Sequence, residues 1–153
     1  MLASVKVDSV VSRLIAQNKK QLIHTVARYA AKPCGLDVAT LQNQLMAAEA
    51  QQSSGIGHGM AIMHMRVPQL QKTHTLFARL TEAVDFDAID NKPVDLVFLI
   101  LSPENESGVH LHRLSALSRL MRNPELRRCL RGTEDSETIY ALLNDPQSRR
   151  FAA

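Results

Sequence analysis

Residues 55–66 read GIGHGMAIMHMR, a glycine-rich segment that runs directly into an apolar one. Glycines at alternate positions add no side chain to a core, so they indicate a backbone that turns tightly or approaches another group closely. The residues from Met60 to Val67 are mostly apolar and predict a buried strand. His64 comes near the end of this strand, and Arg66 follows two residues later. We therefore expect an imidazole that is rigidly held yet accessible, although a histidine that is simply hydrogen-bonded in a buried strand fits the same pattern.

The composition is that of an ordinary globular protein. The chain has 153 residues, of which 45% are hydrophobic and 22% charged, enough for one domain with a real core and too few for two of usual size. The longest apolar run, residues 94–101, is too short to cross a bilayer, and residues 1–11 do not resemble a secretory signal. Cys34 and Cys129 lie far apart without CxxC spacing, which argues against a disulfide framework or a zinc site. We expect a cytoplasmic protein that does not insert into the membrane.

The net charge of +3 is modest, and the excess is local. Five arginines crowd one segment of the chain: Arg119, Arg122, Arg127, Arg128 and Arg131. Aromatic residues make up only 4% of the chain, and none lies within this cluster, whereas nucleic-acid binding favours basic patches with aromatic side chains or a reading helix. We interpret the cluster as a solvated helical face and expect no nucleic-acid partner. An acidic protein partner is the functional alternative.

The pattern of apolar residues predicts helices around a few strands. Asn18 is a plausible N-cap for a helix that ends at Pro33 and Gly35, and a second helix begins near Asp37. Strands are predicted at residues 60–67, 76–80 and 94–101, of which the last is apolar throughout and therefore central in the sheet. Helices are predicted near residues 110–121, 124–130 and 136–143, after an exposed polar loop at 102–108. Residues 1–17 do not decide between strand and helix. This order indicates a layered α/β domain.

The histidines do not form a standard metal motif. His110 and His112 are two residues apart, so on a helix they point in nearly opposite directions and cannot chelate one ion. A zinc site built from His58, His64, His74 and His110 would have no acidic or cysteine ligand nearby and matches no known spacing. A serine hydrolase is also disfavoured, because the sequence has no G-x-S-x-G elbow. We predict no metal site.

Residues 53–64, SSGIGHGMAIMH, closely resemble the active-site signature of the enzyme IIA domains of the bacterial phosphotransferase system. Within that system the resemblance is to the fructose, mannitol and nitrogen-regulatory class. It continues through residues 84–90, 93–100 and 110–117, in the order and at the spacing of that family. The similarity covers about residues 7–143 of a predicted single domain, 1–153, and leaves a polar tail at 144–153.

The resemblance implies a three-layer sandwich, a mixed β-sheet flanked by helices on both faces. It also implies that His64 accepts a phosphoryl group from the phosphocarrier HPr or from its nitrogen-branch counterpart. The second histidine of the family maps onto His110 and supports the phosphorylated ring. Arg66 falls where many members have an arginine close to the phosphoryl group.

The residues themselves suit this chemistry. A neutral imidazole is a competent nucleophile near pH 7, and phosphoryl transfer requires mainly positioning and compensation of negative charge. The residues that we expect to contact the phosphoryl group, through hydroxyls, turn amides or an imidazole, are Ser53, Ser54, Gly55, Gly57 and His58. Met63 and Met65 could form an apolar rim for the donor protein, since methionine adapts well at interfaces. No Walker loop or acidic Mg²⁺ site is visible, and transfer between two histidines needs no cofactor.

The sequence departs from the family at three positions near the histidine. Met63 stands where the family usually has proline, Met65 where it has a small residue, and His58 where asparagine is common. The free-standing chain is most similar to the nitrogen-regulatory branch, whose members relay their phosphorylation state to metabolic and potassium-homeostasis partners. Two alternatives stay open: a fructose- or mannitol-type component serving a separate permease, and a binding module that works without phosphorylation.

Overall fold

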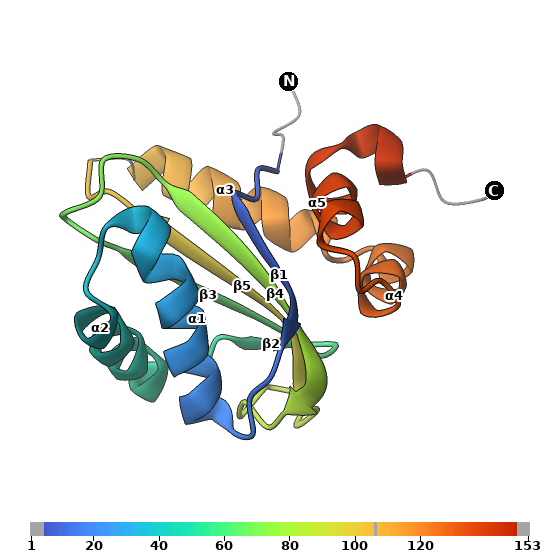
Figure 1. The fold of residues 1–153 in the computed structure, drawn as a ribbon, viewed down its shortest axis with the longest axis horizontal. Coiled ribbons are helices and arrows are strands. Elements are labelled where there is room, and N and C mark those ends of the chain that lie inside the picture. Colours follow the sequence, from blue (N-terminus) through green and yellow to red (C-terminus); the bar gives the residue numbers. More distant parts are fainter. Residues whose placement is uncertain (1–4, 106, 150–153) are drawn as a thin grey trace.

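The structure is a computed structural model that describes residues 5–105 and 107–149, and its centre is a five-stranded sheet with helices on both faces (Figure 1). The strands are β1 (Ser9–Leu14), β2 (Gly55–Gly57), β3 (Met60–Arg66), β4 (His74–Val84) and β5 (Val94–Ser102). The helices are α1 (Lys19–Cys34), α2 (Val38–Gln51), α3 (Ser107–Leu120), α4 (Pro124–Arg131) and α5 (Ser136–Asn144), followed by the 3₁₀ turn η1 (Pro146–Arg149).

The sheet is mixed, with the strand order β1-β4-β5-β3-β2. β1 runs parallel to β4, and β3 runs parallel to β5, whereas β4 with β5 and β2 with β3 are antiparallel pairs. The apolar strand β5 is central, as predicted. Its register with β3 places His64 beside Ile100 and Arg66 beside Ser102. The carboxyl ends of β3 and of the central strand therefore lie side by side.

Two hydrophobic clusters fill the spaces between the three layers. One joins the sheet to α1 and α2 and contains Met63 and Leu99. The other joins the opposite face to α3, α4 and α5 and contains Ile62 and Phe98. Since neighbouring side chains of a strand point to opposite faces, His64 lies on the α3 side of the sheet. The predicted three-layer α/β fold is confirmed.

Side-chain caps set the starts of four helices. Asn18, Asp37, Asn123 and Asp135 each accept a hydrogen bond from a backbone N–H of the first turn. Such caps satisfy donors that have no partner within the helix and are worth about 1 kcal/mol each. The predicted starts at Asn18 and Asp37, and the predicted start of a helix at residue 124, therefore agree with the structure.

Three parts of the fold differ from the prediction or complete it. Residues 9–14 form an edge strand that pairs with β4, a partner more than sixty residues away in the chain, so no local pattern indicated it. β4 itself extends from His74 to Val84, well beyond the predicted 76–80. The predicted exposed loop at 102–108 is wrong at its beginning, because Ser102 belongs to β5 and is fully buried.

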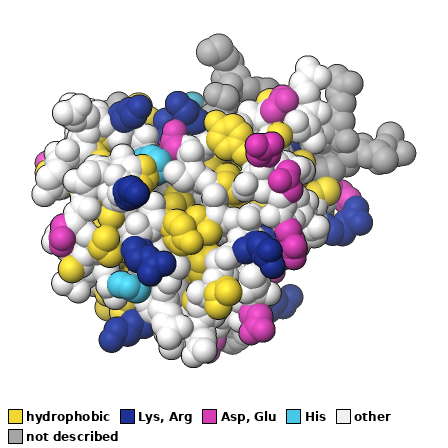
Figure 2. Space-filling view, viewed as in Figure 1, with side chains coloured by type: hydrophobic (Ala, Val, Ile, Leu, Met, Phe, Trp, Pro, Cys, Tyr) yellow, Lys and Arg dark blue, Asp and Glu magenta, His cyan; other side chains and the backbone are white. Residues whose placement is uncertain are grey.

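The surface carries dispersed charge on the face seen in Figure 1. Lysine and arginine side chains are spread among uncharged ones there rather than joined into one continuous patch (Figure 2). Within the described ranges, no helix is both long and apolar enough to span a bilayer.

Candidate phosphoryl-transfer site

Two histidines from different layers meet at the end of β3. Nδ1 of His64, on β3, lies 3.0 Å from Nε2 of His110, on α3. The two ring centroids are 5.1 Å apart and the rings are tilted by 55°. His64 is exposed, whereas His110 is 5% exposed. The pair therefore presents one accessible imidazole, backed by a second one that is almost fully covered.

Ser102 extends this pair into a chain of three groups. Its Oγ lies 2.7 Å from Nδ1 of His110, and the serine is fully buried at the last position of β5. Both ring nitrogens of His110 are thus occupied, one by Ser102 and the other by His64. A buried ring with two partners is fixed in orientation and in the direction of its hydrogen bonds. Of the two nitrogens of His64, only Nδ1 takes part in this chain of hydrogen bonds, which leaves Nε2 available.

The electrostatics of the site favour the neutral form of both rings. Loss of hydration within the site lowers the pKa of His64 below its ordinary value. The pKa of His110 is lowered first by burial, then by the nearby His64 and by the positive charge of Arg66. Arg66 is exposed two residues after His64 on the same face of β3. A neutral imidazole retains the lone pair that nucleophilic attack requires, and Arg66 supplies positive charge beside it.

A groove of about 400 Å³ opens beside His64. Ser53 and Ser54 line it together with His64, as do Leu114 and Ser118 of α3. The hydroxyls of the two predicted serines already have acceptors, since Ser53 Oγ donates to the Phe86 carbonyl at 3.0 Å and Ser54 Oγ donates to Glu49. These serines shape the groove wall, and neither hydroxyl is free to donate to an anion without giving up its present bond.

A buried ion pair holds the wall of the groove in place. Glu49, 8% exposed, accepts the backbone N–H of Ser54 at 3.0 Å and pairs with Nζ of Lys19 at 3.0 Å. The Ser54 carbonyl in turn accepts the N–H of Ile62 at 3.0 Å. Ser54 is therefore fixed on both sides of its backbone, and the groove wall is joined to β3 two residues before His64.

The glycine turn lies at the other end of β3 from His64. Gly57 and Gly59 flank His58 in the tight turn of the β2–β3 hairpin, with φ values of 98°, 75° and 57° for Gly57, Gly59 and His58. His64 lies four residues beyond the start of β3, about 13 Å along the strand at about 3.3 Å per residue. A hairpin carries its turn away from the other end of the strand, so this placement does not favour the contacts of Gly57 and His58 with a phosphoryl group on His64, which stay a prediction.

Two further predicted residues face the interior. The N–H of Gly55 donates to Ser53 Oγ at 3.2 Å, and a Cβ at this glycine would come within 2.8 Å of Ala88. Gly55 therefore serves close packing rather than anion binding. Met63 is 1% exposed in the cluster under α1 and α2, so its predicted place in a partner surface is wrong, since it points to the face opposite His64. Met65 is half-buried on that same side.

Exposed apolar side chains occur instead on β2 and α3. Val109 and Leu111 flank His110 on α3 and are 40% and 61% exposed, and Ile56 lines the groove and is 44% exposed. The other histidine considered as a ligand, His74, contacts Ser9 Oγ through Nε2 at 2.9 Å. Among residues 5–105 and 107–149, no three potential metal ligands come together.

Comparison with known proteins identifies the family. The family model "Phosphoenolpyruvate-dependent sugar phosphotransferase system, EIIA 2" matches residues 4–145. The chain belongs to this enzyme IIA family. The nitrogen regulatory protein of Bradyrhizobium diazoefficiens is 35% identical over 139 residues, covering 91% of each chain. The fructose-specific EIIA component of Haloferax volcanii is 37% identical over 99 residues, covering 65% of this chain and 64% of that protein.

A solved structure agrees with this assignment. The crystal structure of nitrogen regulatory protein IIA-Ntr from Neisseria meningitidis superposes with a TM-score of 0.84 at 33% identity, covering 88% of this chain and 92% of that one. The resemblance noted from the sequence is confirmed at the level of the enzyme IIA family, with similarity to its nitrogen-regulatory members. Two residues of this candidate site, Ser102 and Glu49, were not predicted from the sequence. Neither carries a local signal, because their importance depends on which atoms the fold brings beside them.

Proposed function

We propose that this enzyme IIA is a phosphocarrier of the nitrogen-related phosphotransferase system that accepts a phosphoryl group on His64 and signals through its phosphorylation state. The observation that carries this proposal is the contact of His64 Nδ1 with His110 Nε2 at 3.0 Å. It occupies one nitrogen of an exposed ring and leaves the other, Nε2, as the nucleophile. The donor is a phosphorylated HPr or its nitrogen-branch counterpart, both expected in the cytoplasm.

The direction of the hydrogen bonds follows from the chemistry. For Nε2 of His64 to attack, the ring proton must sit on Nδ1, and this N–H donates a hydrogen bond to Nε2 of His110. Nδ1 of His110 then carries its own proton and donates to Ser102 Oγ. His64 and His110 are thus held in single tautomers, and Ser102 acts as a positioning residue two contacts away from the reacting atom.

The transfer step balances without a cofactor. The bond from phosphorus to the donor nitrogen breaks as the bond from phosphorus to Nε2 of His64 forms, and the donor keeps the electron pair of the broken bond. The His64 ring gains positive charge, which the hydrogen bond from Nδ1 to His110 disperses. Negative charge on the phosphoryl oxygens faces Arg66, which is suited to such charge. The chain's own groups therefore supply both the nucleophile and the compensation that a loose transition state needs.

The donor would dock on the apolar rim formed by Ile56, Val109 and Leu111. Ile56 lines the groove and is exposed, and Val109 and Leu111 are the exposed neighbours of His110 in the sequence of α3. Apolar side chains surrounding a polar centre exclude water when a partner covers them, which strengthens the electrostatic interactions inside. The downstream targets are regulatory proteins, and the resemblance to the nitrogen-regulatory branch makes potassium-homeostasis proteins candidates.

The test is the intact mass after incubation with phosphoenolpyruvate, enzyme I and the phosphocarrier. We expect one acid-labile phosphoryl adduct in the wild type, none in His64→Ala, and an unchanged adduct in the matched control His58→Ala. Absence of an adduct in the wild type with either donor, while the donor itself is phosphorylated, would refute the carrier function. An adduct that persists in His64→Ala would move the acceptor to another residue.

A second candidate is a fructose-type enzyme IIA that feeds a separate sugar permease. The similarity to the fructose-specific component of Haloferax volcanii favours it. Transfer from His64 to a sugar permease, with dephosphorylation on addition of fructose or mannitol, would decide for it. A phosphorylation-independent module, the third alternative, predicts that His64→Asp and His64→Ala bind regulatory targets equally.

A further inference from the structure

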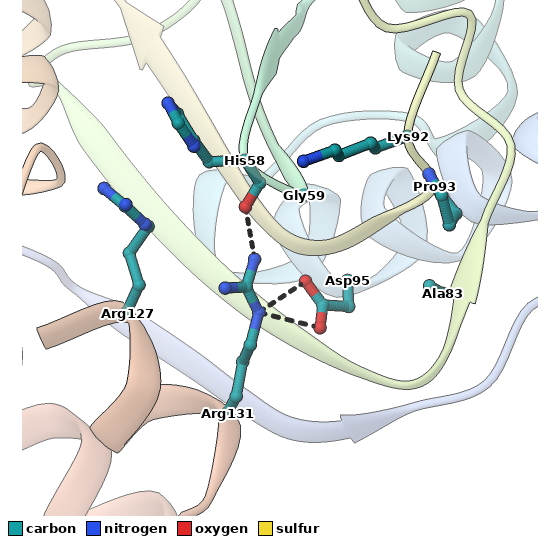
Figure 3. A pocket seen from close by; sticks show the side chains of 8 residues that line it. All are labelled: His58, Gly59, Ala83, Lys92, Pro93, Asp95, Arg127 and Arg131. Carbon is teal, nitrogen blue, oxygen red and sulfur yellow. Dashed lines mark hydrogen bonds and ion pairs between the residues drawn. The ribbon is translucent and has the colours of Figure 1, made fainter. Parts of the chain in front are cut away.

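A second hollow lies at the other end of β3, around the turn of the β2–β3 hairpin (Figure 3). We call it the turn pocket and define it by His58 of the turn, Lys92 just before β5, Asp95 at the start of β5, and Arg127 and Arg131 of α4. Its volume is about 420 Å³, within the range of small-molecule sites. Figure 3 shows side chains from these three separate segments arranged around the same space. Long-range folding, rather than one basic run of sequence, therefore creates it.

Positive charge exceeds negative charge in the turn pocket. Three cations, those of Lys92, Arg127 and Arg131, line it together with one carboxylate, that of Asp95. Asp95 is taken by Arg131, whose Nε lies 3.0 and 2.9 Å from its two oxygens. Asp90 sits below the turn, where its carboxylate accepts the backbone N–H groups of His58 and Lys92. Within residues 5–105 and 107–149, neither Lys92 nor Arg127 forms a salt bridge. The pKa of the Asp90 carboxyl is lowered first by the hydrogen bonds from His58 and Lys92 and then by the charge of Lys92, which therefore does act on this carboxylate.

The arginines are held in position before any ligand arrives. Arg131 is fixed by Asp95 and by its hydrogen bond to the carbonyl of His58. Nη1 of Arg127 donates to the Met121 carbonyl at 2.8 Å. Arg79 donates to the carbonyls of Leu130 and Arg131, which ties the end of α4 to β4. Side chains that are already ordered lose less entropy when they bind, so the pocket is preorganised for an anion.

We propose that the turn pocket binds a small metabolite that carries two or more phosphate charges. Guanidinium groups match phosphate oxygens with paired N–H donors, and a lysine adds a mobile point charge. Two cations beside a fixed arginine suit a diphosphate or a bisphosphate better than a single phosphate. The cations surround a hollow rather than line a strip, so an extended acidic peptide fits less well. The arginine cluster that the sequence presented as a solvated face is thus divided, with Arg127 and Arg131 turned into the pocket.

The test is a titration of the full ¹⁵N-labelled chain with sodium pyrophosphate at constant ionic strength, followed by NMR. We expect saturable shifts of the amides of His58, Gly59 and Lys92, at lower concentrations than with orthophosphate. The double variant Lys92→Gln/Arg127→Gln should bind pyrophosphate about tenfold more weakly, as expected for losing charge-assisted hydrogen bonds. The matched control is Lys20→Gln/Arg28→Gln, which removes two exposed charges from α1 and should leave the binding unchanged.

Several results would overturn the proposal. Shifts that grow linearly to the highest concentration, or that weaken equally in both double variants, would show general ionic attraction. Saturable shifts centred on His64 instead of the turn would place the anion in the other site. Tighter binding of a polyglutamate peptide than of pyrophosphate would assign the pocket to an acidic protein. The readout does not depend on phosphoryl transfer, so it is independent of the function proposed for His64.

Discussion

Two histidines of the same short sequence lie near opposite ends of β3, His58 in the turn before the strand and His64 toward its carboxyl end. The fold gives them different surroundings. His64 contacts His110, which contacts Ser102, so its ring orientation is fixed by two further side chains. His58 stands at a turn with φ 57°, and its backbone rather than its ring makes the contacts, through Asp90 and Arg131. One end is thus built to hold a neutral ring, and the other to gather positive charge. Two histidines close together in the sequence need not share a site, because β3 carries His64 away from the turn that holds His58.

The largest expected effect comes from a change at the His64 end of β3 alone. In the mechanism that we propose, His110→Ala removes the acceptor for the Nδ1–H of His64 and the group that would disperse charge on the phosphorylated ring. We expect the rate of phosphoryl acceptance to fall about 100-fold, the range of positioned acid–base partners, measured by rapid quench with the phosphocarrier. His112→Ala, two residues along α3 and exposed, is the control. Equal rates in the two variants would contradict the role of His110.

The next effect concerns the turn end. Gly59→Ala places a Cβ at φ 75°, in collision with Nη2 of Arg131 and 2.9 Å from Oδ1 of Asp95. The left-handed backbone and the displaced arginine should lower the free energy of unfolding by about 2 kcal/mol, measured by urea denaturation. Gly108→Ala, which meets nothing within 4 Å, should have a smaller effect. Wild-type stability in Gly59→Ala would show that Arg131 does not hold the turn.

A smaller effect tests Ser102, the buried end of the hydrogen-bonded chain that it forms with His110 and His64. Ser102→Ala leaves Nδ1–H of His110 without its partner in a buried place, so the ring loses its fixed tautomer. We expect phosphoryl acceptance to slow about tenfold, corresponding to the roughly 1.4 kcal/mol of one lost buried hydrogen bond. The ¹⁵N shifts of the His110 ring should move toward a mixture of tautomers, a change that simple loss of stability would not produce. Ser115→Ala on the exposed side of α3 is the control, and unchanged ring shifts in Ser102→Ala would refute the positioning role.

The smallest effect is the dependence on pH. Loss of hydration lowers the pKa of His64, so the ring stays neutral through the ordinary histidine value of about 6.5. The rate of acceptance should therefore change less than about twofold between pH 8 and 6.5, and fall only at lower pH as the ring becomes protonated. The same sign applies to stability, which is lost as the pH drops because the unfolded chain binds the proton more readily. A midpoint above 6.5 would contradict the neutral pair.

Much of the fold was predictable because its signals are local. The caps at Asn18 and Asp37 and the apolar run of β5 each depend on neighbouring residues, and the family resemblance added the layer order. β1 and the full length of β4 were not predictable, since their pairing joins distant segments. At the site, His64 and His110 were found through the resemblance. Ser102 and Glu49 were missed, because a serine after an apolar run and a glutamate in a helix look ordinary until the fold supplies their partners.

The pairing of β1 has a consequence for how the chain acquires its structure. Ser9 pairs with Leu76, and the N–H of Val7 donates to the side chain of Asn144, 137 residues away. During synthesis, this early segment has no partner until β4 emerges from the ribosome, and its last contact waits for α5. Such distant pairing slows folding, because the chain loses the entropy of closing a long loop before the stabilising contacts can form. β1 precedes both of its partners in the chain and is thus among the last of these strands to be fixed, and α5 completes the contacts of this sheet edge.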